Sequence, residues 1–239
     1  MRKLSLLFAT AFFFTLLSCA GRTPLESIKR ELVKYPEYSV LLEDMNVEGM
    51  LFKDYYHRYK VVFGQETGVG DSLAYESYLT DWFQVKKKEY EKYNNYLGMV
   101  IASKSRDGKI DDTPFPPGYQ YVGDPRYGQW RQDSNGNSFW EFYGKFAFFS
   151  HMFGMFSRPI YRSGWDDYRD YRGRGQPFFG QNRQYGTSGK YTQQTNKSFF
   201  ERRQQREAAR KQNFAEKVKR RTNRSRMSSV RRRSGGFGK

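Results

Sequence analysis

Apolar and polar positions alternate over residues 51–64, which predicts a β-strand with one aromatic face. That face would carry Tyr55, His57, Tyr59, Val61 and Phe63. Residues 24–35 have a helical apolar spacing instead, and Thr23 and Glu26 can form a capping box at the start of that helix. Short apolar runs predict further strands at residues 39–42, 82–85 and 99–102, and a helix at residues 86–97.

These elements indicate an α+β fold with a small, mainly antiparallel sheet and a few helices. We expect this globular domain to span residues 23–156. The strongly apolar residues 139–156 predict a strand that leads into a buried helix. A segment that dips into the membrane interface or docks a partner is the alternative for the same stretch.

The charge of the chain divides it into two parts. The net charge is +17, and the first 156 residues contain equal numbers of basic and acidic side chains. Residues 157–239 contain 23 Lys+Arg and 6 Asp+Glu, with few aliphatic residues. Such a stretch buries too little apolar surface to offset its ordering entropy, so we expect a disordered basic tail. Only residues 199–221 favour a helix, and its apolar face is too thin for stability alone.

The amino terminus has the plan of a secretory signal peptide. Arg2 and Lys3 are followed by an uncharged, Leu- and Phe-rich run at residues 4–17, directly before Cys19. This run is shorter than the ~18 to 20 residues that a permanent membrane-spanning helix needs. Cys19 is the only cysteine, so no disulfide forms within one chain.

Leu16-Leu17-Ser18-Cys19 resembles the lipobox of bacterial membrane lipoproteins. The resemblance implies that residues 1–18 are removed, that Cys19 receives acyl chains such as palmitate, and that residues 19–22 form a short linker. It places the protein in the bacterial cell envelope. Ala20 after the cysteine implies the outer rather than the inner membrane, if the organism has both. An ordinary cleaved signal peptide or an uncleaved anchor is the alternative, with Cys19 as an incidental thiol.

The residue types that carry chemistry are sparse. The two histidines, His57 and His151, lie in apolar patterns and are expected in or just below the core. No metalloprotease, Walker or nucleophile-elbow motif is present in the sequence. Residues 103–114 approach the spacing of an EF-hand loop but end in proline, so a turn is expected there, as at residues 133–137. We expect no metal, no cofactor and no catalytic residue. Aromatic residues at 116–130 either stack on sugars or pack over the core edge.

An exported basic tail meets anionic lipid, lipopolysaccharide or wall polymers rather than nucleic acid. A soluble, flexible basic tail without a specific partner is the alternative. The sequence therefore predicts a non-enzymatic, lipid-anchored envelope protein with a binding or structural role. A wall or glycan hydrolase that uses carboxylates is one alternative. A nucleic-acid-binding protein is another, if the signal peptide is misread. The candidate polyanion-binding residues are Arg202, Arg203, Arg206, Arg210, Lys211, Lys217, Lys219, Arg220, Arg221, Arg231, Arg232 and Arg233.

Overall fold

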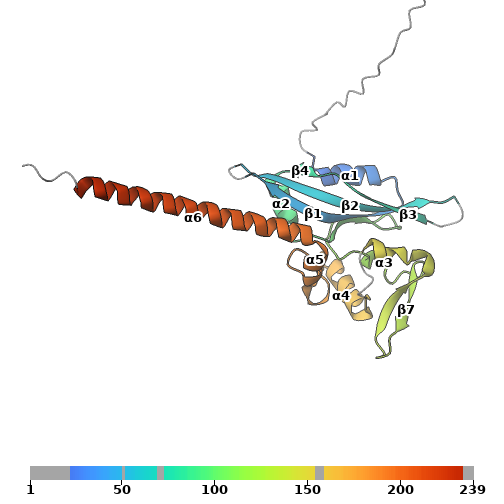
Figure 1. Cartoon of the computed structure of the whole chain (residues 1–239). Helices are drawn as coiled ribbons and strands as arrows, with labels where there is room; N and C mark the ends of the chain where they lie inside the picture. Colours follow the sequence, from blue (N-terminus) through green and yellow to red (C-terminus); the bar gives the residue numbers. More distant parts are fainter. Residues whose placement is uncertain (1–21, 50–51, 69–72, 154–158, 234–239) are drawn as a thin grey trace, which may run out of the picture.

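A mainly antiparallel sheet forms the centre of the protein in the computed structural model, which describes residues 22–49, 52–68, 73–153 and 159–233 (Figure 1). Its strand order is β3–β2–β1–β5–β6, and β4 also pairs with β2. The α+β fold class is thus confirmed. The strands are β1 (Glu37–Glu48), β2 (Asp54–Glu66), β3 (Leu73–Leu79), β4 (Phe83–Val85), β5 (Val100–Lys104) and β6 (Ile110–Asp111).

Helices and a second, two-stranded sheet surround this centre. The α-helices are α1 (Pro24–Leu32), α2 (Lys87–Tyr93), α3 (Phe148–Met152), α4 (Arg162–Gly173), α5 (Lys190–Thr195) and α6 (Lys197–Arg233). The 3₁₀ turns are η1 (Tyr119–Tyr121), η2 (Gly144–Phe146) and η3 (Gln181–Arg183), and the hairpin is β7 (Gly128–Gln132) with β8 (Ser138–Phe142). The predicted capping box is present at the start of α1, where Thr23 and Glu26 exchange hydrogen bonds of 3.3 Å.

The two faces of the central sheet are covered by different parts of the chain. Val40 and Leu42 of β1 face one side, where α1, α2 and Phe199 pack against them. Leu41, between them, faces the other side and joins a core formed by η1, β7–β8, α3 and α4. Figure 1 shows α1 on one side of the sheet and α3, α4 and β7 on the other. Alternation along a strand lets one element serve two cores.

The predicted aromatic face of β2 is buried, and His57 is a core residue as expected. Its side chain is fully buried, stacks on Tyr90 at 5.5 Å between ring centroids, and places Nδ1 3.0 Å from the Tyr59 hydroxyl. Burial lowers the pKa of His57 to about 4, so the ring is neutral at pH 7. The side chain of His151 lies outside the described ones.

The folded part continues well beyond residue 156, which corrects the expectation of a disordered tail that starts at residue 157. Tyr168 and Phe178 are buried in the core under the second face of the sheet. Tyr185 and Tyr191 pack with Met99, and Phe199 reaches the first core. These rings are far apart along the chain, so they produce no periodic pattern. Each aromatic side chain nevertheless buries roughly 150–250 Å², enough to order the segment around it.

Helix α6 begins on the domain and then leaves it. Arg202 Nη2 donates to Asp44 Oδ1 at 2.6 Å, and Arg206 Nη1 donates to Asn46 Oδ1 at 2.9 Å. The helix has 37 residues, more than the expected 199–221, and is therefore about 55 Å long. Beyond its first turns it projects away from the sheet (Figure 1). No helix in the described ranges is both long and apolar enough to cross a bilayer.

Candidate functional site

A cavity of about 490 Å³ lies where the start of β1, the β5–β6 hairpin, the η1–β7 segment and α4 meet. We call it the Glu37 cavity. Its lining combines carboxylates, cations and aromatic rings from segments far apart in the sequence. The carboxylates are Glu37, Asp107 and Asp124, and the cations are Arg106, Lys109, Arg126, Arg169 and Arg172.

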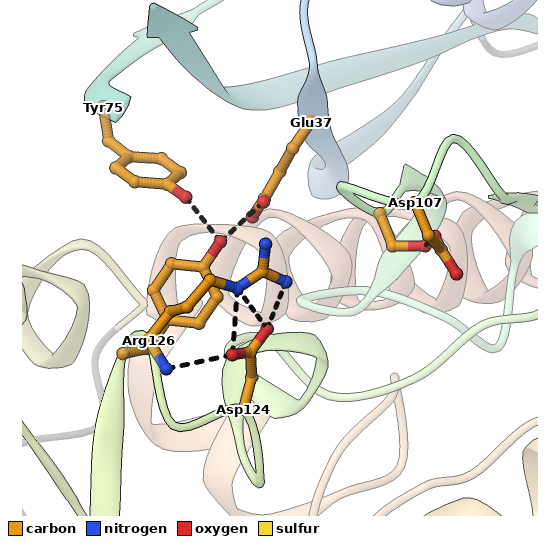
Figure 2. Close-up of polar contacts among 7 residues, drawn as sticks. Glu37, Tyr75, Asp107, Asp124 and Arg126 are labelled. Carbon is orange, nitrogen blue, oxygen red and sulfur yellow. Dashed lines mark hydrogen bonds and ion pairs between the residues drawn. The ribbon is translucent and has the colours of Figure 1, made fainter. Parts of the chain in front are cut away.

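Glu37 lies at the inner wall of this cavity and is only 3% exposed. The Tyr127 hydroxyl donates to Glu37 Oε2 at 2.8 Å, and the Tyr75 hydroxyl donates to that of Tyr127 at 3.0 Å (Figure 2). Glu37 opens β1 opposite Gly64 of β2, and the strand alternation turns it toward the second face of the sheet. Burial raises the pKa of Glu37 above its ordinary value, and the hydrogen bond from Tyr127 opposes this shift only in part.

Asp124 and Arg126 form a rigid pair in the loop before β7. Arg126 Nε lies 3.0 Å from both carboxylate oxygens of Asp124, and the Arg126 backbone N–H also donates to Oδ1 at 3.0 Å (Figure 2). Partial burial raises the pKa of Asp124, but the hydrogen bonds and charge of Arg126 outweigh it, so the net shift is downward. The pKa shifts of Asp124 and Glu37 therefore have opposite directions.

Asp107 lies in the turn between β5 and β6, on another side of the same cavity. The Ser105 hydroxyl donates to Asp107 Oδ1 at 2.6 Å and the Lys109 backbone N–H donates to the same oxygen at 3.2 Å. The hydrogen bond from Ser105 lowers the pKa of Asp107. The turn expected in this stretch is confirmed. So is the one after Asp133, whose carboxylate accepts from the backbone of Asn135 and Asn137.

The cations of the cavity differ in how far they are already neutralised. Arg172 Nε donates to Asp111 Oδ2 at 2.6 Å, and its Nη1 donates to the Tyr168 hydroxyl at 2.9 Å. The Arg169 guanidinium instead lies over the Trp165 ring, 4.8 Å from its centroid. Within the described part of the chain, neither Arg169 nor Lys109 forms a salt bridge with a carboxylate. Two positive charges of the cavity are therefore available to a ligand.

Sequence reasoning missed this cavity because no motif links its residues. The sequence did indicate the aromatic residues at 116–130 as candidates. Two roles were considered for them, stacking on sugars and packing over the core edge. The structure supports packing for most of them, since Tyr119, Tyr121 and Tyr127 are buried. The same stretch contributes Tyr119, Gln120, Val122, Asp124, Arg126 and Tyr127 to the lining of the cavity.

The structure separates the predicted polyanion-binding residues into several groups. Arg202 and Arg206 are half-buried and bonded to β1, so they attach α6 to the domain. Arg203 and Arg220 pair with acidic residues one turn away on exposed helix surface. Five others are exposed and have no carboxylate partner among the described residues: Arg210, Lys211, Lys217, Lys219 and Arg221. Arg231, Arg232 and Arg233 belong to α6, but the structure does not describe their side chains. Cys19 lies outside the described residues.

Comparison with known proteins supplies no assignment for this arrangement. No protein-family model, curated protein sequence or solved structure matches the chain. In the described ranges, no group of three or more His, Cys, Asp or Glu side chains is placed to hold a metal ion. The residues that form the cavity and α6 are thus the basis for assigning a function.

Proposed function

We propose that this protein is a lipid-anchored protein of the bacterial cell envelope with a non-enzymatic binding role, in which α6 contacts an anionic surface. The observation that supports this role is the projection of α6 from the domain (Figure 1). Five cations on this helix are exposed. A Lys or Arg side chain near an anionic membrane surface gains about 1 kcal/mol at modest salt. Five such side chains on one helix provide an attraction that strengthens as salt is lowered.

The amino-terminal end of the domain fits a short tether. Thr23 caps α1 and is the fourth residue after Cys19. A linker of residues 19–22 spans about 14 Å when fully extended, so acyl chains on Cys19 would hold the domain next to the bilayer. Anionic lipid, lipopolysaccharide or a wall polymer would then lie within reach of α6, with the outer membrane favoured where the organism has one.

The interaction of α6 is tested by sedimentation with vesicles of phosphatidylglycerol and phosphatidylcholine. The protein used is the mature full chain with Cys19→Ala. It carries no acyl chains, so only protein contacts remain. Changing Arg210, Lys211, Lys217, Lys219 and Arg221 to Gln should abolish most binding at low salt. The control changes Gln204, Gln205 and Gln212 to Ala on the same helix and should bind as the parent does. Equal binding by the Gln-substituted and parent chains would contradict the role of α6.

The anchor is tested separately by fractionation of cells and by mass spectrometry of the mature amino terminus. We expect an acylated Cys19 at the amino terminus in the membrane fraction, and Cys19→Ala should prevent processing or release the protein. An unmodified thiol on a full-length chain in the cytosolic fraction would overturn the envelope assignment. It would favour the nucleic-acid-binding alternative.

The hydrolase alternative has one supporting observation, the opposite pKa shifts of Glu37 and Asp124 in one aromatic cavity. Glycoside hydrolysis uses two carboxyl groups at one site, of which the general acid has a raised pKa. If the protein is a hydrolase, Glu37→Gln should lower the release of reducing ends from wall glycans by about 10²-fold or more. No release by the wild-type chain would eliminate this alternative.

A further inference from the structure

We infer that the Glu37 cavity is a binding site for an acidic saccharide, a sugar unit that carries a carboxylate or a phosphate. This inference concerns the folded domain and does not depend on the lipid anchor or on α6. It rests on the charge, the open hydrogen-bonding positions and the shape of the cavity.

The charge of the cavity favours an anionic ligand. Its lining holds more cations than carboxylates, and Arg169 and Lys109 reach it from different elements, α4 and the β5–β6 hairpin. Neither forms a salt bridge with a carboxylate of the described chain. An anionic group placed between them would gain charge-assisted hydrogen bonds, and the Arg169 guanidinium offers the paired donors that suit a carboxylate or phosphate.

The carboxylate of Asp107 favours a ligand that also donates hydrogen bonds. All described hydrogen bonds to Asp107 end on Oδ1, which leaves Oδ2 without a donor. An anion without hydroxyl groups has no hydrogen-bond donor for this oxygen. A sugar supplies hydroxyl groups that act as donors and acceptors.

Shape and lining fit a sugar better than a lipid. A volume of about 490 Å³ lies within the ordinary range for small-ligand sites. Val122 is the only aliphatic side chain described in the lining, so the cavity offers no channel for an acyl chain. Trp165, Tyr119 and Tyr127 provide the aromatic walls. The combination of rings, carboxylates and unneutralised cations therefore indicates an acidic sugar.

Binding is measured by calorimetry on the mature full chain with Cys19→Ala and the five α6 substitutions to Gln, so that tail charges do not contribute. The probes are galacturonate oligomers, their neutral methyl esters, sialyllactose, glucose 6-phosphate and mannose 6-phosphate. We expect at least one acidic probe to bind and the neutral esters not to bind. Whether the carboxylated or the phosphorylated probes bind identifies the anionic group.

The variant Arg169→Gln with Lys109→Gln should bind that probe at least about tenfold more weakly, since each change removes a charged hydrogen-bond donor. The control, Lys87→Gln with Arg131→Gln, removes the same charges from exposed positions outside the cavity and should leave affinity unchanged. Circular dichroism verifies that both variants are folded. Binding of no acidic probe, equal binding of the neutral esters, or full affinity in the cavity variant would overturn the inference. None of these results would alter the outcome with vesicles.

Discussion

Glu37 shows how the burial of one carboxyl makes stability depend on pH. Its carboxyl lies under the sheet with one hydroxyl donor described, and burial raises its pKa above the ordinary value of 4.5. The folded state therefore binds the proton more tightly than the unfolded state. The stability that Glu37 provides is greatest below pH 4.5 and falls as the pH rises toward the raised pKa.

Glu37→Gln should therefore gain stability relative to the wild type as the pH rises from 4 to 8. Each pKa unit of the shift corresponds to about 1.4 kcal/mol in the difference between the two unfolding free energies. Urea denaturation across this pH range measures it. The control is Glu141→Gln, because hydrogen bonds from Arg131 and Gln129 lower the pKa of that carboxyl. The Glu141→Gln chain should instead lose stability relative to the wild type as the pH rises. Parallel curves for the two variants would show that Glu37 is not destabilised by burial.

The Tyr127 hydroxyl should stabilise the buried carboxyl group of Glu37. Tyr127→Phe removes the donor to Glu37 Oε2 and leaves a buried acceptor unmet, which costs about 1–3 kcal/mol of unfolding free energy. Tyr143→Phe, at a hydroxyl on the protein surface, should change stability by much less. Thermal denaturation at pH 7 compares the two. A Tyr127→Phe chain as stable as the control would mean that the Glu37 hydrogen bond adds nothing.

Gly123 is required by the close packing of α4 on the loop before β7. Its φ is +83°, and a Cβ atom there would lie 2.2 Å from Cζ2 of Trp165. Gly123→Ala should therefore cost about 2 kcal/mol or more, from backbone strain plus displacement of the indole. Gly136→Ala has a similar φ of +81° with no atom within 4 Å, so it isolates the strain alone. Equal losses in a denaturant titration would show that the contact with Trp165 is unimportant.

At the scale of elements, the sequence predicted what local patterns determine. The alternation of β2, the capping box of α1 and the strand-to-helix transition after residue 138 depend on neighbours in the chain, and all three are present. The layer that covers the second face of the sheet was not predicted. Leu41 and Val62 pack against this layer, but each is a single apolar position between residues that face the other side. Such positions look the same in sequence whether water or a helix faces them.

The contact between β1 and α6 joins two elements that are about 160 residues apart in the chain. Asp44→Asn weakens the bond to Arg202, and we expect a loss of about 1 kcal/mol, since the pair is partly exposed. Glu207→Gln, which removes an exposed pair within α6, should cost close to nothing. Urea denaturation provides the comparison. If the two variants lose the same stability, the contact with Asp44 does not fix the helix to the sheet.

The composition of the whole chain correctly separated a charge-balanced part from a basic one, but folding does not follow that division. The cationic segment at residues 159–199 contributes Tyr168, Phe178 and Phe199 to buried cores, although it is too polar for hydropathy to indicate a domain. Neither the Glu37 cavity nor its charge could be predicted, because the strand pairing and the loops together determine which distant side chains meet there. Only the three-dimensional arrangement contains that information.

Limited proteolysis with trypsin distinguishes the boundary in the structure from the one that composition suggested. Arginines occur both on α4 and along the projecting part of α6, but only α4 is packed against a core. Between Arg206 and residue 224, where side chains are described, no hydrogen bond or ion pair to the rest of the domain is present. Local unfolding, the step that admits a protease, is therefore easiest there. Early cleavage should therefore fall after residue 206 and leave the bonds after Arg169 and Arg172 intact. Mass spectrometry of the first fragments identifies the sites. Cleavage at α4 as fast as in α6 would show that the basic segment does not complete the domain.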